Sequence, residues 1–378
     1  MRRTESHLLP SSSPGTRREL LVHRYGPSGG KKAVIQASLH ADELPGILVA
    51  QHLGALLEGA ELLGEVVVVP YANPIGLSQV QGGTLLGRYD TNSQENFNRR
   101  FMDFIPPLRE RLAGQLGPDA VANVHRIREE MIRILEEKKP VGELETLRWW
   151  LVRLAVDADI VLDLHCDFAA VLHMYCGTPL GWEGADLAAE LGVLVNLVAE
   201  ESGGNPFDEA LGAPWWAMAK QFPGVAVPPA CFSATVELRG EADVSDSFAE
   251  QDAAAIFRFL QRRGLIAGDP GPLPPLRCEP TPLEGVQMLR SPATGLLVWK
   301  QPLGAQVRAG SIVATVDADF ELFFRLVGPR EARVRVALYH PTHEAEVEPC
   351  VLEEFFAVTV VRAPEETLGD VMANVAAT

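Results

Sequence analysis

Two kinds of apolar pattern alternate along the first two thirds of the chain. Residues 33–39, residues 160–164 and the EVVVV run before Pro70 are almost continuously apolar, which is typical of strands buried on both faces of a parallel sheet. Residues 44–57 and 247–263 instead repeat their apolar positions at the spacing of a helix. The alternation predicts an α/β fold with a mixed, mostly parallel sheet flanked by helices.

The rest of the chain divides around this α/β domain, which we place at residues 19–265. Residues 1–18 contain arginines but no apolar core of a signal peptide, and we predict a disordered tail there. Residues 106–156 combine helical spacing with dense mixed charge and predict a helical excursion inside the domain. Prolines concentrate in residues 266–282, which predicts a linker. Short apolar runs between glycine turns in residues 283–378 predict a smaller all-β, barrel-like domain.

The C-terminal region resembles half of the hammerhead-like barrel of biotinyl and lipoyl domains. Such carriers present a modified lysine on an exposed hairpin, whereas Lys300 stands at a predicted strand end. We therefore interpret this region as a structural barrel. It would shape the mouth of a pocket or contact another copy in a homo-oligomer.

Composition and charge exclude several classes of function. At 378 residues with 47% hydrophobic content, the chain is long enough for two cores. The formal net charge of −17 argues against a nucleic-acid-binding protein, which would carry a basic face. No stretch approaches the roughly 20 apolar residues that cross a membrane. The five cysteines are scattered and odd in number, unlike a secreted disulfide framework, so we expect a cytoplasmic protein without nucleic-acid or membrane partners.

Candidate metal ligands follow two of the predicted strands. His40 and Glu43 stand three residues apart in HADE, directly after the first buried strand, and His165 ends the strand at residues 160–164. Because binding residues gather outside the carboxyl ends of parallel strands, these side chains can converge. Asp163 leaves its strand on the same face as His165 and could orient the imidazole. Two imidazoles and one carboxylate suit zinc, so we predict one Zn²⁺ per chain.

Two further segments carry residues suited to hydrolysis. Glu237 interrupts the β-branched run CFSATVELRG, where it could act as a general base or simply pair with Arg239. The loop GRYDTNSQENFNRRF contains Arg88, Asn98 and Arg99. Guanidinium groups on a loop can bind a carboxylate or polarise a carbonyl, although a solvated basic loop explains this segment alone equally well.

The order of these motifs resembles the succinylglutamate desuccinylase/aspartoacylase family of the zinc carboxypeptidase superfamily. HADE, NFNRRF, DLH and then Glu237 near a glycine follow one another as in that family over residues 30–260, and the C-terminal region fits the family's small β domain. The resemblance implies zinc ligands, a general base and acid, a pair that binds the substrate carboxylate and a residue that stabilises the oxyanion. These are, in that order, His40, Glu43 and His165; Glu237; Asn98 and Arg99; and Arg88.

The chain also departs from the family pattern. Where the family commonly has Asp-Leu-Asn-Arg, this chain has Asn-Phe-Asn-Arg, so Asn96 replaces a carboxylate. The stretch between Arg88 and Asn98 is longer than in the family, and Glu237 is followed by Leu-Arg-Gly. These differences argue against assigning the substrate of either enzyme in the family name.

Residues and resemblance together predict a zinc-dependent hydrolase, a deacylase that cleaves the amide bond of an N-acyl amino acid or related N-acyl amine. Zinc would lower the pKa of its bound water to about 7, and Glu237 would take the proton of that water. The expected substrate is a small anionic N-acylated amino acid. Two alternatives remain open, a zinc carboxypeptidase acting on peptides and a non-catalytic zinc- or metabolite-binding protein.

Overall fold

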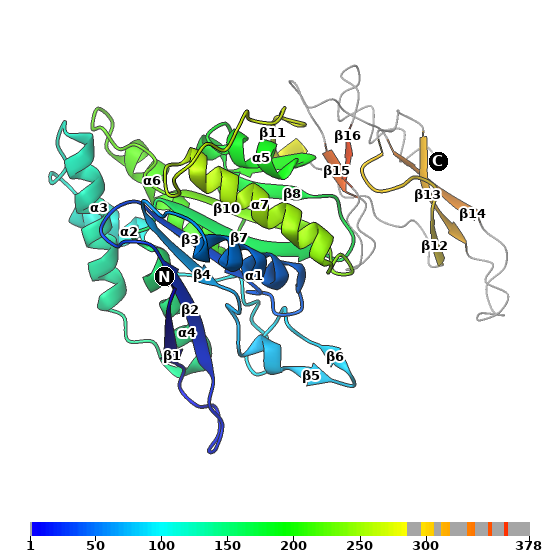
Figure 1. Cartoon of the computed structure of the whole chain (residues 1–378), viewed down its shortest axis with the longest axis horizontal. Coiled ribbons are helices and arrows are strands. Elements are labelled where there is room, and N and C mark those ends of the chain that lie inside the picture. Colours follow the sequence, from blue (N-terminus) through cyan, green and yellow to red (C-terminus); the bar gives the residue numbers. More distant parts are fainter. Residues whose placement is uncertain are drawn as a thin grey trace.

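A nine-stranded sheet forms the centre of the protein. The computed structural model describes residues 2–285, 296–305, 311–317, 331–336, 347–349 and 359–361. Within these ranges the main sheet has the order β1-β2-β4-β3-β7-β10-β8-β9-β11 (Figure 1). Its strands are β1 (Arg3–Leu8), β2 (Glu19–Tyr25), β3 (Lys32–Ala37), β4 (Glu65–Val69), β7 (Ile160–Asp167), β8 (His173–Gly177), β9 (Val195–Ala199), β10 (Phe232–Gly240) and β11 (Pro280–Pro282).

Parallel pairing dominates the middle of the sheet. Strand β3 is parallel to β4 and β7, β7 is parallel to β10, and β8 is parallel to β9. Strand β8 runs antiparallel to β10, and β2 runs antiparallel to both β4 and β1. The predicted mixed, mostly parallel sheet flanked by helices is therefore confirmed.

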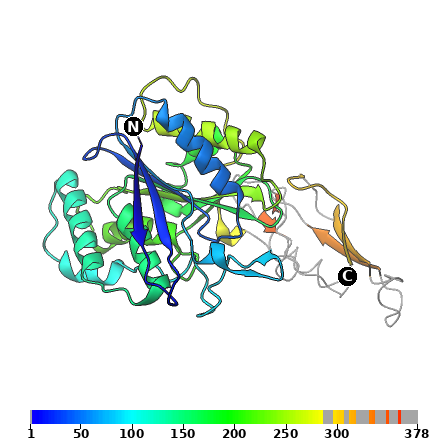
Figure 2. The same cartoon turned by 60° about the horizontal axis from the view of Figure 1, so that its bottom comes forward.

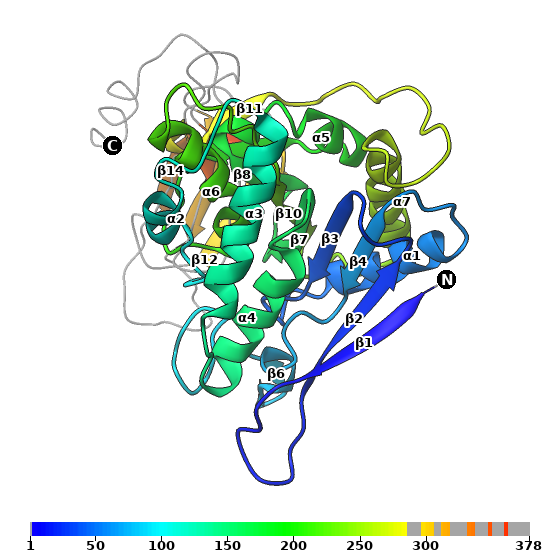
Figure 3. The same ribbon diagram turned by 90° about the vertical axis from the view of Figure 1, so that its left-hand side faces the viewer.

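Helices cover both faces of the sheet. In the described part of the chain they are α1 (Pro45–Glu58), α2 (Ile105–Arg111), α3 (Ala120–Glu136), α4 (Gly142–Ala155), α5 (Ala185–Leu191), α6 (Phe207–Gln221) and α7 (Asp246–Arg262). Figures 1 and 2 show α1 and α7 side by side over one face, and in Figure 3 the sheet separates them from α3 and α4. None of these helices is long and apolar enough to span a membrane.

Successive side chains of the central strands point alternately into two separate hydrophobic cores, one on each face of the sheet. Ile35 of β3 and Leu162 of β7 enter the core under α1, α5 and α7. Val34 and Val161, one residue earlier on each strand, enter the core under α2, α3, α4 and α6. Because side chains two residues apart share a face, Asp163 and His165 extend the line of Val161 toward α6. The candidate site therefore lies on the α6 face, at the carboxyl edge of the parallel strands.

The structure corrects the prediction for residues 1–18. Residues 3–8 form β1, which pairs along its whole length with β2. Its sequence RTESHL is polar, so no apolar periodicity indicated a strand. An edge strand is held largely by backbone hydrogen bonds to its neighbour, and charged side chains are common on such edges. The ion pair between Glu5 and Arg24 of β2, at 2.9 Å, adds to this pairing.

Most of the predicted C-terminal domain lies outside the described residues. The described strands there are β12 (Leu296–Trp299), β13 (Ser311–Asp317) and β14 (Glu331–Val336), which form an antiparallel sheet, and the antiparallel pair β15 (Val347–Pro349) and β16 (Thr359–Val361). The helical excursion expected at 106–156 contains α2, α3 and α4.

Packing of α1 on the sheet gives a stability test. Leu53 is fully buried in the core under α1, whereas Leu56 on the same helix is 41% exposed. We expect Leu53→Ala to lower the free energy of unfolding by about 2–5 kcal/mol, because it leaves a cavity. Leu56→Ala should change it by less than about 0.5 kcal/mol. Chemical denaturation of both variants measures the difference. An equal loss of unfolding free energy in the two variants would contradict this packing of α1 on the sheet.

Candidate metal centre

A tightly braced turn after β3 positions His40 and Glu43. Ser38 adopts a φ of 63°, a left-handed conformation that few non-glycine residues accept, and it redirects the chain out of the sheet. The amide of buried Asn73 donates to the carbonyl of Leu39 at 2.8 Å. The backbone N–H of Ala41 donates to the carbonyl of Gly87 at 3.0 Å. These contacts hold the turn from two other segments of the chain.

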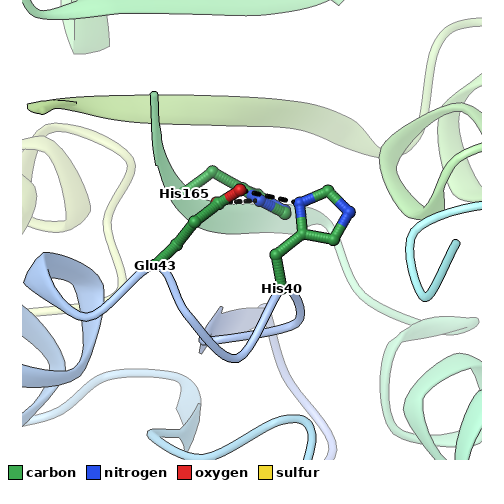
Figure 4. A group of neighbouring side chains, drawn as sticks. All are labelled: His40, Glu43 and His165. Atoms are coloured by element: carbon green, nitrogen blue, oxygen red, sulfur yellow. Dashed lines mark hydrogen bonds and ion pairs between the residues drawn. The ribbon is translucent and has the colours of Figure 1, made fainter. Parts of the chain in front are cut away.

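Three side chains converge on one point at this edge. Glu43 Oε1 lies 2.8 Å from His40 Nδ1, and Glu43 Oε2 lies 2.6 Å from His165 Nδ1 (Figure 4). One ligand atom from each residue lies within 4.8 Å of the other two, and all three residues are buried. The convergence of His40, Glu43 and His165 that the sequence predicted is present in the structure.

An oxygen atom lies close to the far nitrogen of each imidazole. Asn96 Oδ1 accepts the backbone N–H of Asn98 at 2.8 Å, which identifies that atom as the amide oxygen. His40 Nε2, 2.9 Å from the same oxygen, must therefore be a donor. His165 Nε2 lies 2.9 Å from Asp163 Oδ2, an ion-pair distance, although this oxygen accepts no hydrogen bond from the described residues.

These partners test whether the residues fit a metal ion. A neutral imidazole whose Nε2 carries the proton presents a lone pair at Nδ1, and here both Nδ1 atoms face carboxylate oxygens of Glu43. At such distances a proton or a metal cation must lie between each nitrogen and its carboxylate oxygen. Nitrogen and carboxylate donors suit a divalent transition metal, and a hydrogen-bonded Nε2 is usual for ligating histidines. The donor set therefore fits a bound divalent cation.

The electrostatics of the trio agree with this arrangement. Burial opposes ionisation of Glu43, but His40 and His165 beside it lower the pKa of this carboxyl below its ordinary value. Burial likewise opposes the charged form of His165, yet Asp163 and Glu43 raise the pKa of this imidazole well above its ordinary value. The carboxylates beside the two histidines concentrate negative charge, which a bound cation would neutralise.

Arg88 reaches the trio because Gly87 has no side chain. A Cβ on Gly87 would lie 2.0 Å from the backbone nitrogen of Asp42, so only glycine allows the two loops to touch. Arg88 Nη1 then donates to Glu43 Oε1 at 3.0 Å, although the side chain remains 44% exposed. The long stretch between Arg88 and Asn98 forms a closed loop in which the N–H of Phe97 donates to the carbonyl of Arg88.

Glu237 faces the same cavity and forms no ion pair with a cationic side chain in the described part of the chain. On β10, Val236 and Leu238 enter the core under α7, so Glu237 points the opposite way, beside His165 of β7. The alternative pairing with Arg239 is wrong. Arg239 has a φ of 65° at a bulge in β10, and its guanidinium pairs with Asp252 of α7.

The surroundings of Glu237 oppose its ionisation. Glu237 Oε2 has no hydrogen-bond partner among the described residues. Burial, with the charge of Glu43, raises the pKa of Glu237 to about 8. A divalent cation at Glu43 would favour the ionised form and draw that pKa down again.

Asn98 and Arg99 occupy the next stretch of the cavity wall. Asn98 Oδ1 accepts the backbone N–H of Phe207 at the start of α6, and Asn98 Nδ2 lies 3.5 Å from His165 Nε2. Arg99 donates to the carbonyl of Asn98 at 2.7 Å, and its stem packs against Gly204. The start of α6 and the loop before it thus hold both residues against the candidate metal centre.

All seven residues singled out from the sequence line one cavity of about 350 Å³. They are His40, Glu43, Arg88, Asn98, Arg99, His165 and Glu237. Sequence reasoning missed the first-turn residues of α6, Asp208 and Glu209, and also Tyr175 of β8. It treated Asn96 only as a lost carboxylate, whereas its amide oxygen orients His40. For the α6 residues, the adjacent acidic pair in NPFDEALGAPWW was the one local signal in the sequence.

Comparison with known proteins supports the resemblance drawn from the motifs. Residues 29–132 match the model of the succinylglutamate desuccinylase/aspartoacylase catalytic domain. That segment includes His40, Glu43, Arg88, Asn98 and Arg99 but neither His165 nor Glu237. A search of the curated proteins finds no match.

Solved structures match nearly the whole chain. A succinylglutamate desuccinylase/aspartoacylase family protein from Shewanella amazonensis is 25% identical, with a TM-score of 0.78 and 96% of each chain covered. One from Shewanella frigidimarina is 23% identical, with a TM-score of 0.79, and 95% of this chain and 97% of that chain are covered. The fold is also that of the ectoine utilization protein EutE from Ruegeria pomeroyi, at 17% identity and a TM-score of 0.63, with 95% of this chain and 94% of that chain covered.

In its fold and in the sequence of residues 29–132, this protein resembles the succinylglutamate desuccinylase/aspartoacylase family, as its motif order predicted.

Proposed function

We propose that this protein is a zinc-dependent deacylase that hydrolyses the amide bond of an N-acyl amino acid. The observation that carries the proposal is the pair of Nδ1 atoms facing one carboxylate, beside a glutamate in the same cavity whose Oε2 has no hydrogen-bond partner among the described residues. A protein that only binds zinc or a metabolite has no need of that glutamate. The resemblance to a family named for two deacylases supports the same reaction.

His40, Glu43 and His165 would hold the ion, with Asn96 and Asp163 orienting the two imidazoles. When bound, Zn²⁺ supplies Lewis-acid polarisation of a carbonyl and acidifies water. Glu43 also accepts the backbone N–H of Cys166 at 3.1 Å, so its carboxylate is held from both the turn after β3 and the end of β7.

Glu237 is placed to move the proton during amide cleavage. Its carboxylate would accept a proton from the attacking water and return it to the nitrogen of the departing amine. Arg88, half-exposed beside Glu43, would donate to the oxygen on which negative charge develops. Arg99 would bind the free carboxylate of the amino acid through its guanidinium, with the Asn98 amide beside it.

The metal site is tested by removing one imidazole. We expect purified wild-type protein to hold about one zinc ion per chain, and His165→Ala to lose most of it, because two donors bind far more weakly than three. His52→Ala, on a part-exposed histidine of α1 that contacts Asp246, is the matched control and should retain the metal. Metal analysis after dialysis measures both, and full zinc occupancy in His165→Ala would refute the assignment.

The proton-transfer role of Glu237 is tested by its isosteric amide. We expect Glu237→Gln to bind zinc at the wild-type level but to lose deacylation by a factor on the order of 10²–10⁴, since glutamine cannot accept the proton. Turnover of N-acyl amino acids and metal content are measured on the same preparation. Near wild-type turnover in this variant would eliminate Glu237 as the base.

Recognition of the substrate carboxylate is tested with neighbouring arginines. Arg99 lines the cavity, whereas the Arg100 side chain is 71% exposed and pairs with Glu95. We expect Arg99→Ala to raise KM by at least about tenfold, because a charge-assisted bond to the substrate is lost. Arg100→Ala should leave KM unchanged. Steady-state kinetics of the two variants decide, and an unaltered KM in Arg99→Ala would remove Arg99 from this role.

A further inference from the structure

The first turn of α6 places a buried carboxylate in the wall of the cavity. Asp208 and Glu209 both line it and are only 6% and 9% exposed. Glu209 accepts the backbone N–H of Ser202 at 2.6 Å. Among the described residues, no arginine, lysine or histidine forms an ion pair or hydrogen bond with the carboxylate of Asp208. A buried carboxylate without a cation is costly, so its persistence here requires a reason.

The position of Asp208 connects it to the reaction site. Phe207, the preceding residue, donates its backbone N–H to Asn98, whose amide lies 3.5 Å from His165. The stem of Arg99 is packed by the loop that leads into α6. Asp208 therefore lines the same cavity as the candidate metal centre and the proposed carboxylate-binding arginine.

A structural role explains Asp208 only in part. Carboxylates in the first turn of a helix interact favourably with the helix dipole. Asp246 in the first turn of α7 is such a residue, but its side chain is 78% exposed and keeps its hydration. At Asp208, burial together with Glu209 and Asp163 raises the pKa to about 7, so the dipole does not offset the loss of water.

The cavity lining as a whole contains more acidic than basic side chains. Two cationic side chains, Arg88 and Arg99, face a larger set of acidic ones that line the same space. The acidic residues are Glu43, Asp167, Asp208, Glu209 and Glu237. A dication at Glu43 would offset part of this charge, but a substrate with two carboxylates would still meet an unfavourable field.

We propose that the substrate is an N-acylated basic amino acid, whose cationic side chain pairs with Asp208 while its carboxylate pairs with Arg99. This inference rests on the proposed deacylase function and names its substrate class. It replaces the anionic substrate expected from the sequence with a zwitterionic one. The enzyme would select this substrate because the cationic side chain of the substrate supplies the partner that the buried Asp208 carboxylate lacks.

Substrates that differ in one charge test the proposal. With zinc-loaded enzyme, kcat/KM is compared for Nα-acetyl-L-ornithine, Nα-acetyl-L-norleucine and Nα-acetyl-L-glutamate, and for the three Nα-succinyl counterparts. We expect the ornithine derivative to exceed both others by at least about tenfold. Asp208→Asn should remove that preference by lowering kcat/KM for the ornithine derivative on the order of a hundredfold, with the norleucine derivative little changed. Equal or higher activity on the glutamate or norleucine derivatives would overturn the proposal.

Two controls separate the possible failures. Asp246→Asn removes a first-turn carboxylate outside the cavity and should leave the preference intact. If Asp208 served only the helix dipole, Asp208→Asn would lower the melting temperature as Asp246→Asn does and leave the preference unchanged, which overturns the proposal. Binding of the free amino acids is measured by calorimetry. If no N-acyl amino acid is hydrolysed, the deacylase function fails, while tighter Asp208-dependent binding of ornithine than of norleucine would still support the cation subsite.

Discussion

The structure of the site depends on one carboxylate shared by two imidazoles. Glu43 directs one oxygen to Nδ1 of His40 and the other to Nδ1 of His165. Asn96 and Asp163 lie beside the opposite nitrogens, so the Nδ1 atoms of both imidazoles face the shared carboxylate. The positive charge between these atoms can come from protons on the imidazoles or from a bound cation, and the donor set suits a divalent metal.

The sheet makes this convergence possible. Strands β3, β7 and β10 are adjacent and parallel, so the residues that follow them meet at one edge. The register places Glu237 opposite His165, which brings the proposed base beside the ligands. Gly87 lets the loop that carries Arg88 approach the turn after β3. From the helical excursion, Arg148 donates to the carbonyl of Asn96 at 2.9 Å and braces the segment that orients His40.

The resemblance to the family accounts for the residues of the proposed reaction. It does not account for the residues that would select the substrate. The candidate metal centre contains the residue types that the motif order implied, whereas the α6 wall of the cavity carries acidic residues that no motif indicated. Metal ligands must match the geometry of one ion. Residues that select a substrate need only lie on the part of a helix that lines the cavity. Catalytic machinery and substrate class can therefore be inferred from different parts of the molecule.

Strand and helix periodicity determined the α/β class, and the ends of the buried strands located His40, Glu43 and His165, because these signals are local along the chain. The polar strand β1 was missed, since its pairing with β2 depends on backbone bonds rather than on apolar spacing. Only the tertiary structure showed that Arg239 turns to Asp252, that Asn96 acts as the acceptor for His40 and that Asp208 faces the cavity. Each of these depends on contacts between residues far apart in the chain or on a local backbone twist, neither of which residue spacing alone reveals.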